Sequence, residues 1–496
     1  MYFTKEDEID LAKRGLTTAD LANIIYQFSH QTQPIILERP CTSSDGILSL
    51  NTSQSHKYLD FFEKESSKIS MMKFVPASGA ASRMFKHLYS YSPQNVGTLE
   101  EEFIVNFDLF PFYPILKRNF EEDNLSLENL IEKNDWSTIL NRILFSPGLE
   151  YSKFPKGLVP FHKYPFEIRT AFEEHIHEAI DYSREADGTC RIHFTLAPHQ
   201  IDDVMKFLTD QVKAFPYENF ILQHSLQEEK TDTPAIDKDN NPIRDQEGKI
   251  IFRPAGHGAL IHNLESLEAD VIFIKNIDNV TTSDQKADSI FFKKILAGLL
   301  LFLKSETDKH LNKLSEDGFS SVGPALEFIQ NWFQPGTPFG MNEEQLKVYA
   351  IHQLDRPIRV CGMVRNEGEP GGGPFWVKSK DGLLSKQIVE KSQVDLHDIA
   401  QSRILSGSTH FNPVDIVCSI KRRDGSKYRL SDFIDHSTGF ISEKFTDGKV
   451  IRALELPGLW NGSMALWNTV FIEVPNTTFN PVKTVNDLLR PGHQVA

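Results

Sequence analysis

The sequence predicts an α/β fold built around a largely parallel sheet. Apolar or alternating runs at 71–75, 191–196 and 269–275 have the composition of strands. Stretches with the spacing of amphipathic helices, such as 168–182 and 201–213, lie between them. Because strands that alternate with helices of this length form crossover units, we expect a mostly parallel sheet that binds ligands outside the carboxyl ends of its strands.

The composition is that of a globular protein with an acidic balance. The chain has 496 residues, is 40% hydrophobic and carries a formal net charge of -15, which is enough material for a core in more than one domain. No apolar run has the length of a membrane helix and the charged N-terminus has no secretory core, so we expect a cytoplasmic protein without a membrane partner. The acidic charge, with no basic run, predicts no nucleic-acid partner. Four isolated cysteines suggest neither a zinc knuckle nor a disulfide framework.

The chain divides into an extension, a catalytic domain and a tail. Residues 1–70 have helical spacing and predict a helical N-terminal extension. Residues 71–490 form the expected catalytic domain, in which 87–150 is a mainly helical insertion, and 491–496 are the tail. The 87–150 segment could instead be a separate domain, but a Pro-Lys-Gly turn and an apolar run follow it directly, which favours an insertion. Its role and the oligomeric state stay open.

The segment 74–86, FVPASGAASRMFK, predicts a strand that runs into a phosphate-binding turn. The small residues of this turn are Ala77, Ser78, Gly79, Ala80, Ala81 and Ser82. Small side chains let a phosphate approach main-chain N–H groups, and Arg83 could then bind the same anion. The alternative is a close packing corner between a strand and a helix.

Three further turns are candidates for ligand contacts. Lys156 lies in a Pro-Lys-Gly turn, where a lysine is usually only a solvated residue. Gly256-His257-Gly258 is a second glycine turn that opens a helix. The run 366–374 is too glycine-rich for regular structure, which predicts either a ligand-facing flap or a surface loop.

Asp278 follows the apolar strand 269–275 and lies where a sheet of this kind places a functional carboxylate. A carboxylate near phosphate-binding turns suits Mg²⁺, which prefers oxygen ligands and needs only one or two of them from the protein. The alternative is an Asx turn or helix cap without metal, made by Asp278 or Asn279.

In their order along the chain, these segments resemble the UDP-sugar pyrophosphorylase group of sugar-1-phosphate nucleotidyltransferases. The G-G-x-G-T-R loop of that family is similar to 78–83, and its P-K-G lysine to Lys156, although about seventy residues intervene here where the family has a few. The G-N-G-G turn is similar to 256–259. The N-x-D-N strand end is matched fully by 276–279.

The resemblance continues to the end of the chain. The F-N turn of the family recurs as Phe411-Asn412. The family ending V-P-R-S-R-F-x-P-V-K-T-x-x-D-L-L is similar to residues 474–489, which include Lys483. The resemblance implies a divergent branch of the family with the Rossmann-like, three-layer fold of nucleotide-diphospho-sugar transferases (GT-A type).

The implied reaction joins a nucleoside triphosphate to a phosphorylated sugar and releases pyrophosphate, with Mg²⁺ as cofactor. The resemblance assigns Arg83 and Lys156 to the triphosphate and Lys483 to the incoming phosphate. The other implied positions are Ala77, Ser78, Gly79, Ala80 and Ser82 at the nucleotide phosphates; Gly256, His257, Gly258, Gln223 and His224 at the base; Asn412, Gly372 and Gly373 at the sugar phosphate; and Asp278 with Asp415 at the metal.

Two alternative functions stay open. A glycosyltransferase that uses an existing nucleotide sugar could keep the 276–279 metal site, but would not need Lys156 and Lys483. A non-catalytic nucleotide or sugar sensor is favoured by the serine and alanine that replace glycine in the first loop. The base and the sugar are not determined by the sequence, since His257 and Ala259 depart from the family's base turn.

Overall fold

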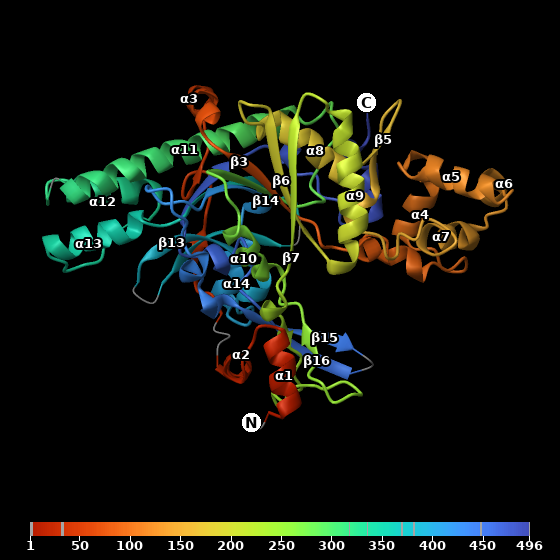
Figure 1. The fold of residues 1–496 in the computed structure, drawn as a ribbon, viewed down its shortest axis with the longest axis horizontal. Helices are drawn as coiled ribbons and strands as arrows, with labels where there is room; N and C mark the ends of the chain where they lie inside the picture. The colour runs from red at the N-terminus through yellow and green to blue at the C-terminus, as the bar shows by residue number, and fades with distance from the viewer. Residues whose placement is uncertain are drawn as a thin grey trace. The chain divides into compact units, whose positions relative to one another are not determined.

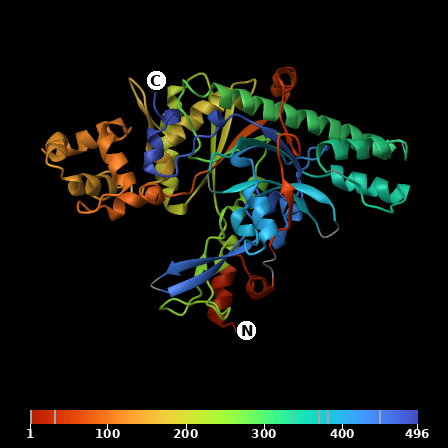
Figure 2. The same cartoon turned by 180° about the vertical axis from the view of Figure 1, so that it is seen from behind.

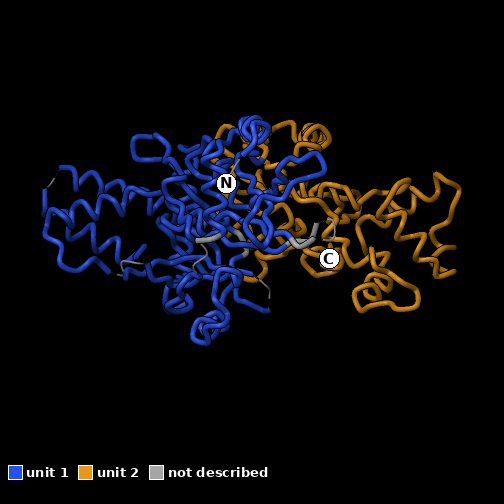
Figure 3. Tube along the Cα trace, turned by 90° about the horizontal axis from the view of Figure 1, so that it is seen from below, with its two compact units in different colours: residues 1–70, 227–272, 295–474 blue, residues 71–226, 273–294, 475–496 orange. Residues whose placement is uncertain are grey.

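The computed structural model describes residues 3–30, 34–316, 318–334, 336–368, 371–379, 382–446 and 449–495. The chain forms two compact units, each assembled from three separate segments (Figure 3). Unit 1 comprises residues 1–70, 227–272 and 295–474, and unit 2 comprises 71–226, 273–294 and 475–496. Strand β10 (Val271–Lys275) and helix α11 (Ala287–Glu316) each run from one unit into the other.

Unit 2 contains parallel strands with helical crossovers. Its strands β3 (Met71–Pro76), β6 (Thr189–Leu196) and β7 (Asn219–Leu226) pair in parallel, and β10 follows β3 on the other side. Helices α8 (Ala171–Tyr182) and α9 (Ile201–Gln211) precede β6 and β7, and a short hairpin, β4 (Pro160–Lys163) with β5 (Ile168–Thr170), precedes α8. The predicted helix 168–182 therefore begins later, at the Thr170 capping box, because its first residues pair as β5.

The 87–150 segment of unit 2 is mainly helical, and both ribbon views show its helices as one cluster (Figures 1 and 2). The helices are α4 (Thr98–Val105), α5 (Tyr113–Glu122), α6 (Leu127–Glu132) and α7 (Trp136–Leu144). Their apolar side chains share one core with the phosphate loop and the C-terminal segment. For example, Phe85 stacks on Tyr151 with ring centroids 5.4 Å apart, and Phe112 packs edge-on against both rings.

Unit 1 contains a sheet in the order β2-β17-β11-β14 and a second, antiparallel sheet in the order β1-β12-β13. The first consists of β2 (Ile47–Leu48), β17 (Asn468–Glu473), β11 (Ile358–Arg365) and β14 (His410–Ser419). The second consists of β1 (Leu37–Pro40), β12 (Gly372–Lys378) and β13 (Leu384–Glu390). Strand β17 is parallel to both neighbours, whereas β14 is antiparallel to β11.

Two short antiparallel pairs and several helices complete unit 1. The pairs are β8 (Thr233–Pro234) with β9 (Phe252–Arg253) and β15 (Phe440–Thr446) with β16 (Lys449–Glu455). The helices are α1 (Lys5–Lys13), α2 (Thr18–His30), α3 (Thr52–Glu65), α10 (Leu260–Glu265), α12 (Val322–Trp332), α13 (Glu343–Leu354) and α14 (Ile399–Ser406). In the described ranges, no helix is both long enough and apolar enough to cross a membrane.

The predicted α/β class with a mostly parallel central sheet is confirmed. The first seventy residues hold the expected helices, but also β1 and β2, which pair with β12 and β17 of unit 1. The glycine run 366–374 was expected to lack regular structure, and this is wrong for Pro374 and for the glycines at 372 and 373. These two residues begin β12, where they pair with Glu390 and Val389 of β13. Glu369 and Pro370 of that run lie outside the described residues.

Candidate functional site

The predicted phosphate loop and the predicted metal ligand meet at one edge of the unit 2 strands. Strand β3 ends at Pro76 and β10 ends at Lys275. The main-chain N–H of Ile277 donates to the carbonyl of Pro76 at 3.3 Å, which joins the two strand ends directly. The loop after β3 and Asp278 therefore lie at the same edge, as expected for the ligand site of such a sheet.

Asp278 is the centre of this site, because two lysines donate to one of its oxygens. The Nζ atoms of Lys156 and Lys483 lie 2.6 Å and 3.2 Å from Oδ2 of Asp278. Asp278 is 7% exposed, and its other oxygen, Oδ1, is buried without a hydrogen-bond partner in the part of the chain that the structure describes. Three residues that are far apart in the sequence, all chosen from it as site residues, are thus in direct contact.

Burial and neighbouring charges shift the pKa values of Lys156 and Asp278. Burial lowers the pKa of Lys156, and the nearby Asp278 charge opposes this only in part. Burial alone would raise the pKa of Asp278, but the charges of Lys156 and Lys483 outweigh it and the pKa lies below its usual value. Two ammonium groups facing one carboxylate leave one excess positive charge, which favours an anionic ligand.

The phosphate loop is fastened to the Pro-Lys-Gly turn. Ala81 N–H donates to the Phe154 carbonyl at 2.9 Å, and Lys156 N–H donates to the Gly79 carbonyl at 3.0 Å. This antiparallel bridge fixes the start of the Lys156 side chain against the loop. The approximately seventy-residue insertion between the two motifs is therefore compatible with their contact.

The tip of the loop has the free donors that an anion site needs. Ser78, Gly79 and Ala80 are exposed, and their main-chain N–H groups have no acceptor within the ranges described above. No residue between 77 and 83 has a positive φ, so serine and alanine fit at the positions where the family has glycine. Arg83 closes the 3-10 turn Ala81–Arg83 and is exposed. The ion pairs of Asp278 among the described residues are those with the two lysines, so Arg83 does not pair with it.

The segment that carries Lys483 is held against the Asp278 strand end by its main chain. Val482 N–H donates to the carbonyl of Asp278 at 3.1 Å, and Asn480 N–H donates to Oδ1 of Asn279 at 2.8 Å. Asn279 was considered above as a turn or cap residue, but its side chain holds the C-terminal segment instead. The motif N-x-D-N thus supplies both the central carboxylate and an anchor for the second lysine.

Asp487 is a supporting residue that the sequence analysis did not single out. Its Oδ2 accepts the N–H groups of Lys483 and Thr484, both at 2.7 Å. These bonds close the turn in which the Lys483 side chain begins. The signal was present in the sequence, because Asp487 belongs to the D-L-L end of the matched motif.

The other predicted positions are distributed over both units. Gln223 and His224 lie on β7 of unit 2, whereas Gly256, His257 and Gly258 belong to unit 1. Their meeting at a nucleotide base stays a prediction.

Within unit 1, the Gly256 turn is packed against the segment 456–460. The His257 ring stacks on Trp460 with centroids 4.1 Å apart, and its Nδ1 accepts the N–H of Leu459 at 3.0 Å. Gly256 has a φ of 80°, and a Cβ on Gly258 would lie 2.2 Å from the carbonyl oxygen of Pro457. The backbone conformation at Gly256 and the close packing at Gly258 therefore explain why glycine is required at both positions, whether or not a base binds there.

Unit 1 also contains the residues expected at the sugar phosphate. Asn412 is 4% exposed, and neither atom of its side-chain amide has a hydrogen-bond partner among the described residues. Unsatisfied buried amides are uncommon, and such a group is available to a polar ligand. Gly373 is the second residue of β12 and lies close to Ser408, and Asp415 is buried on β14 opposite Gly362.

The donor set fits a metal ion that takes few protein ligands. Over the described ranges, no cluster of three or more His, Cys, Asp or Glu side chains could hold a metal ion. The unpartnered Oδ1 of Asp278 is a suitable oxygen for Mg²⁺, which completes its shell with water and substrate phosphates.

Comparisons with solved structures give distant similarities. The chain is similar to the UDP-N-acetylglucosamine pyrophosphorylase of Trypanosoma brucei in complex with an inhibitor, at 13% identity and a TM-score of 0.49 over 98% of this chain and 79% of that chain. It is similar to the UDP-glucose pyrophosphorylase of Leishmania major, described in open and closed structures, at 11% identity and a TM-score of 0.41 over 94% of this chain and 73% of that chain.

No curated protein matches the sequence. The model of one protein family, described as "Domain of unknown function (DUF4301)", matches residues 4–494. The match spans almost the whole sequence, through both units and all the site residues described above. The chain belongs to the DUF4301 family.

Proposed function

We propose that this protein is a Mg²⁺-dependent nucleotidyltransferase, which joins a nucleoside triphosphate to a sugar 1-phosphate and releases pyrophosphate. The observation that carries the proposal is the contact of Lys156 and Lys483 with one oxygen of Asp278, beside a loop with free N–H groups. A glycosyltransferase would need the carboxylate, but not both lysines. The order of the matching sequence motifs supports the same reaction.

The proposed reaction is an in-line attack of a sugar-phosphate oxygen on the α-phosphorus of the triphosphate. The new O–P bond forms as the bond to the β-phosphate oxygen breaks, so pyrophosphate leaves with the electron pair and no protein nucleophile is needed. Catalysis then depends on positioning and on neutralising negative charge. Lysines, an arginine and main-chain N–H groups are suitable for that task.

Each site residue has a defined part in this reaction. Ser78, Gly79 and Ala80 donate main-chain N–H groups to the triphosphate, and Arg83 and Lys156 neutralise it. Lys483 binds the incoming phosphate. Mg²⁺, when bound, supplies a Lewis acid that withdraws charge from the phosphate oxygens.

The lysines have a second role before substrate binds. With the site empty of anions, they neutralise the buried Asp278 carboxylate, which would otherwise be costly to bury. When phosphates arrive, the two Nζ atoms can exchange Oδ2 for phosphate oxygens. This exchange frees Oδ2, so that both oxygens of Asp278 would be available to the metal ion.

The finer assignments belong to the same proposal. Gly256, His257, Gly258 and Gln223 lie against the base, and Asn412, Gly372 and Gly373 bind the sugar phosphate. Asp415 is a second metal ligand. The buried, unpartnered amide of Asn412 supports the sugar assignment.

Pyrophosphate release from a panel of nucleoside triphosphates and sugar 1-phosphates tests the proposal. The panel is run with Mg²⁺ and with a chelator, on the wild type, Asp278→Asn and Asp270→Asn. Asp270 is the matched control, because it lies at the opposite end of β10 and pairs with Lys421. Metal-dependent release with one substrate pair, lost only in Asp278→Asn, supports the function.

Two other outcomes separate the alternatives. Triphosphate binding without release across the panel would support the sensor. Release of a free nucleoside diphosphate from a nucleotide sugar would support the glycosyltransferase.

A further inference from the structure

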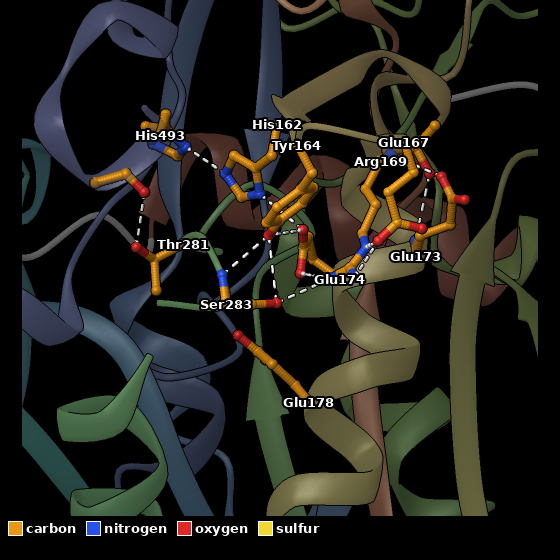
Figure 4. Close-up of polar contacts among 12 residues, drawn as sticks. His162, Tyr164, Glu167, Arg169, Glu173, Glu174, Glu178, Thr281, Ser283 and His493 are labelled. Carbon is orange, nitrogen blue, oxygen red and sulfur yellow. Dashed lines mark hydrogen bonds and ion pairs between the residues drawn. The ribbon is translucent and has the colours of Figure 1, made fainter. Parts of the chain in front are cut away.

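A buried chain of polar side chains in unit 2 connects the C-terminal tail to the segment that carries Lys483 (Figure 4). His162 of β4 lies between Glu174 of α8 and His493 of the tail. Its Nδ1 lies 2.9 Å from Oε1 of Glu174, and its Nε2 lies 2.9 Å from Nδ1 of His493. All three residues are at most 1% exposed.

This series of hydrogen-bonded side chains ends at the backbone of the segment that carries Lys483. Nε2 of His493 donates to the carbonyl oxygen of Asn480 at 3.1 Å. Asn480 lies three residues before Lys483, and its own N–H is bonded to Asn279. The residue is therefore held from both sides, by the Asp278 strand end and by the tail.

The hydrogen bond to Asn480 shows which ring nitrogen of His493 carries a hydrogen. The Asn480 carbonyl can only accept, so His493 carries its hydrogen on Nε2 and its Nδ1 must accept from His162. Burial, with the nearby His162 as a smaller cause, lowers the pKa of His493 to about 3, which agrees with a neutral ring. Burial would raise the pKa of Glu174, but hydrogen bonds from His162 and Tyr164 and the charges of His162 and Arg169 hold it below its usual value.

His162 therefore donates from Nε2 to His493, and its Nδ1 is hydrogen-bonded to Oε1 of Glu174. Neighbouring groups fix Glu174 in turn: Tyr164 Oη donates to its Oε1 at 2.7 Å, and Arg169 Nη1 lies 3.6 Å from Oε2. Figure 4 shows these side chains turned toward Glu174. A hydrogen-bonded network with His162, Glu174 and His493 buried at its centre holds its members in one arrangement.

Two further contacts join the tail to the same region. The Gly492 carbonyl accepts the hydroxyl of Thr281 at 2.7 Å and the N–H of Thr282 at 3.2 Å. A Cβ on Gly492 would lie 2.2 Å from Oδ1 of Asn480, so the tail backbone contacts the Asn480 side chain directly. Residues 492 and 493 thus contact Asn480 through both its side chain and its main chain.

We infer that His493, fixed by His162 and Glu174, is a positioning residue that sets the place of Lys483 relative to Asp278. The inference deepens the proposed function and rests on it for the role of Lys483 in catalysis. Residues 492 and 493, expected to belong to a tail without a role, then become a part of the site. The hydrogen bond from His493 to the carbonyl of Asn480 is the contact through which His493 acts on the position of Lys483.

The experiment measures the reactivity of individual lysines by competitive acetylation and mass spectrometry, and needs no enzymatic activity. His493→Asn removes the donor to Asn480, whereas His493→Gln keeps a side-chain N–H that can reach it. We expect His493→Asn to raise the acetylation rate of Lys483 about threefold or more, the size of one lost hydrogen bond. His493→Gln should stay closer to the wild type.

Lys156 is the internal control, because it is bonded to the same carboxylate but belongs to a turn that the tail does not hold. Its acetylation rate should change by less than about twofold in both variants. His177→Gln is a matched control on α8. The half-buried His177 ring packs against Phe215 and is not a member of the hydrogen-bonded series of His162, Glu174 and His493. A general loss of stability would raise the rates of many lysines together and would overturn the inference, as would an unchanged Lys483.

Gly492→Ala provides a second test that leaves every buried charge in place. Its Cβ displaces Asn480, so Lys483 acetylation should rise here as well, and an unchanged rate would contradict the inference. In the pyrophosphate-release assay, His493→Asn should lower kcat/KM for the sugar phosphate about tenfold and change KM for the triphosphate by less than about twofold.

The two hypotheses fail in different ways. If the wild type has no nucleotidyltransferase activity but His493→Asn still raises the acetylation rate of Lys483, the proposed reaction is refuted and the positioning contact is supported. If the wild type is active and His493→Asn changes neither the acetylation rate of Lys483 nor kcat/KM, the positioning role is refuted and the proposed reaction is supported.

Discussion

The Nζ of Lys156 lies 2.6 Å from Oδ2 of Asp278, and Lys483 donates to the same oxygen. The ion pair is substantially shielded from water, since the two side chains are 13% and 10% exposed. In such surroundings a charge acts more strongly on a bound phosphate than it would in water.

Replacement of Lys156 by Met should lower kcat/KM for pyrophosphate release by a factor on the order of 10² to 10³. The substitution removes a charge that interacts with the transferring group and keeps a side chain of similar length. Lys153→Met, at an exposed position three residues earlier, is the control and should remain near the wild type. Equal losses in both variants would refute a specific role for Lys156.

The alkaline limb of the pH profile should depend on the same lysine. Because burial lowers the pKa of Lys156 from 10.5, its charge is lost at a lower pH than in a free side chain, and kcat/KM should fall there as pH rises. Lys156→Arg keeps its charge throughout and should move the alkaline limb to higher pH. An alkaline limb that Lys156→Arg leaves in place would assign it to another group.

The phosphate loop should be sensitive to charge and tolerant of size. Ser78→Asp places a carboxylate beside the free N–H groups and should raise KM for the triphosphate about tenfold or more by repulsion. Ser78→Asn has nearly the same shape and no charge, so its KM should change little. Gly79→Ala should also be tolerated, because a Cβ there meets no atom within 4 Å and φ is not positive. Equal effects of Asp and Asn at position 78 would argue against a phosphate at this loop.

Stability should depend on a buried ion cluster behind the site. Glu178 is 3% exposed and accepts from Lys73 and Lys275, each at 2.7 Å. Glu178→Ala leaves both ammonium groups buried without their counterion and should cost about 3–5 kcal/mol of unfolding free energy. Urea unfolding followed by circular dichroism measures the loss.

Lys68→Ala is the comparison for this cluster, because its ion pair with Glu65 is largely exposed. It should cost no more than about 1 kcal/mol. Similar losses for Glu178→Ala and Lys68→Ala would show that the buried cluster contributes little.

The sequence determined the elements and the chemistry of the central site. Buried strands such as β3 and β10 follow from apolar runs, and small residues or an aspartate at their ends follow from local composition. Lys156, Asp278 and Lys483 could be chosen because residue type and local motif suffice to suggest charge neutralisation. Lys156 and Lys483 contact Asp278 across 122 and 205 residues of sequence. The order of the motifs suggested these contacts, and only the folded structure shows them.

Other features depended on partners that no local pattern encodes. Gly372 and Gly373 form a strand because β13 supplies hydrogen bonds that outweigh the low strand preference of glycine. His162 and His493 have no distinctive local pattern, and they meet across 331 residues. The hydrogen bond between them, and the one from His493 to Asn480, arise from burial and from the need to satisfy each buried donor and acceptor. Tertiary packing determines which polar groups are buried and which partners they meet, whereas the sequence alone determines hydrophobic periodicity and residue type.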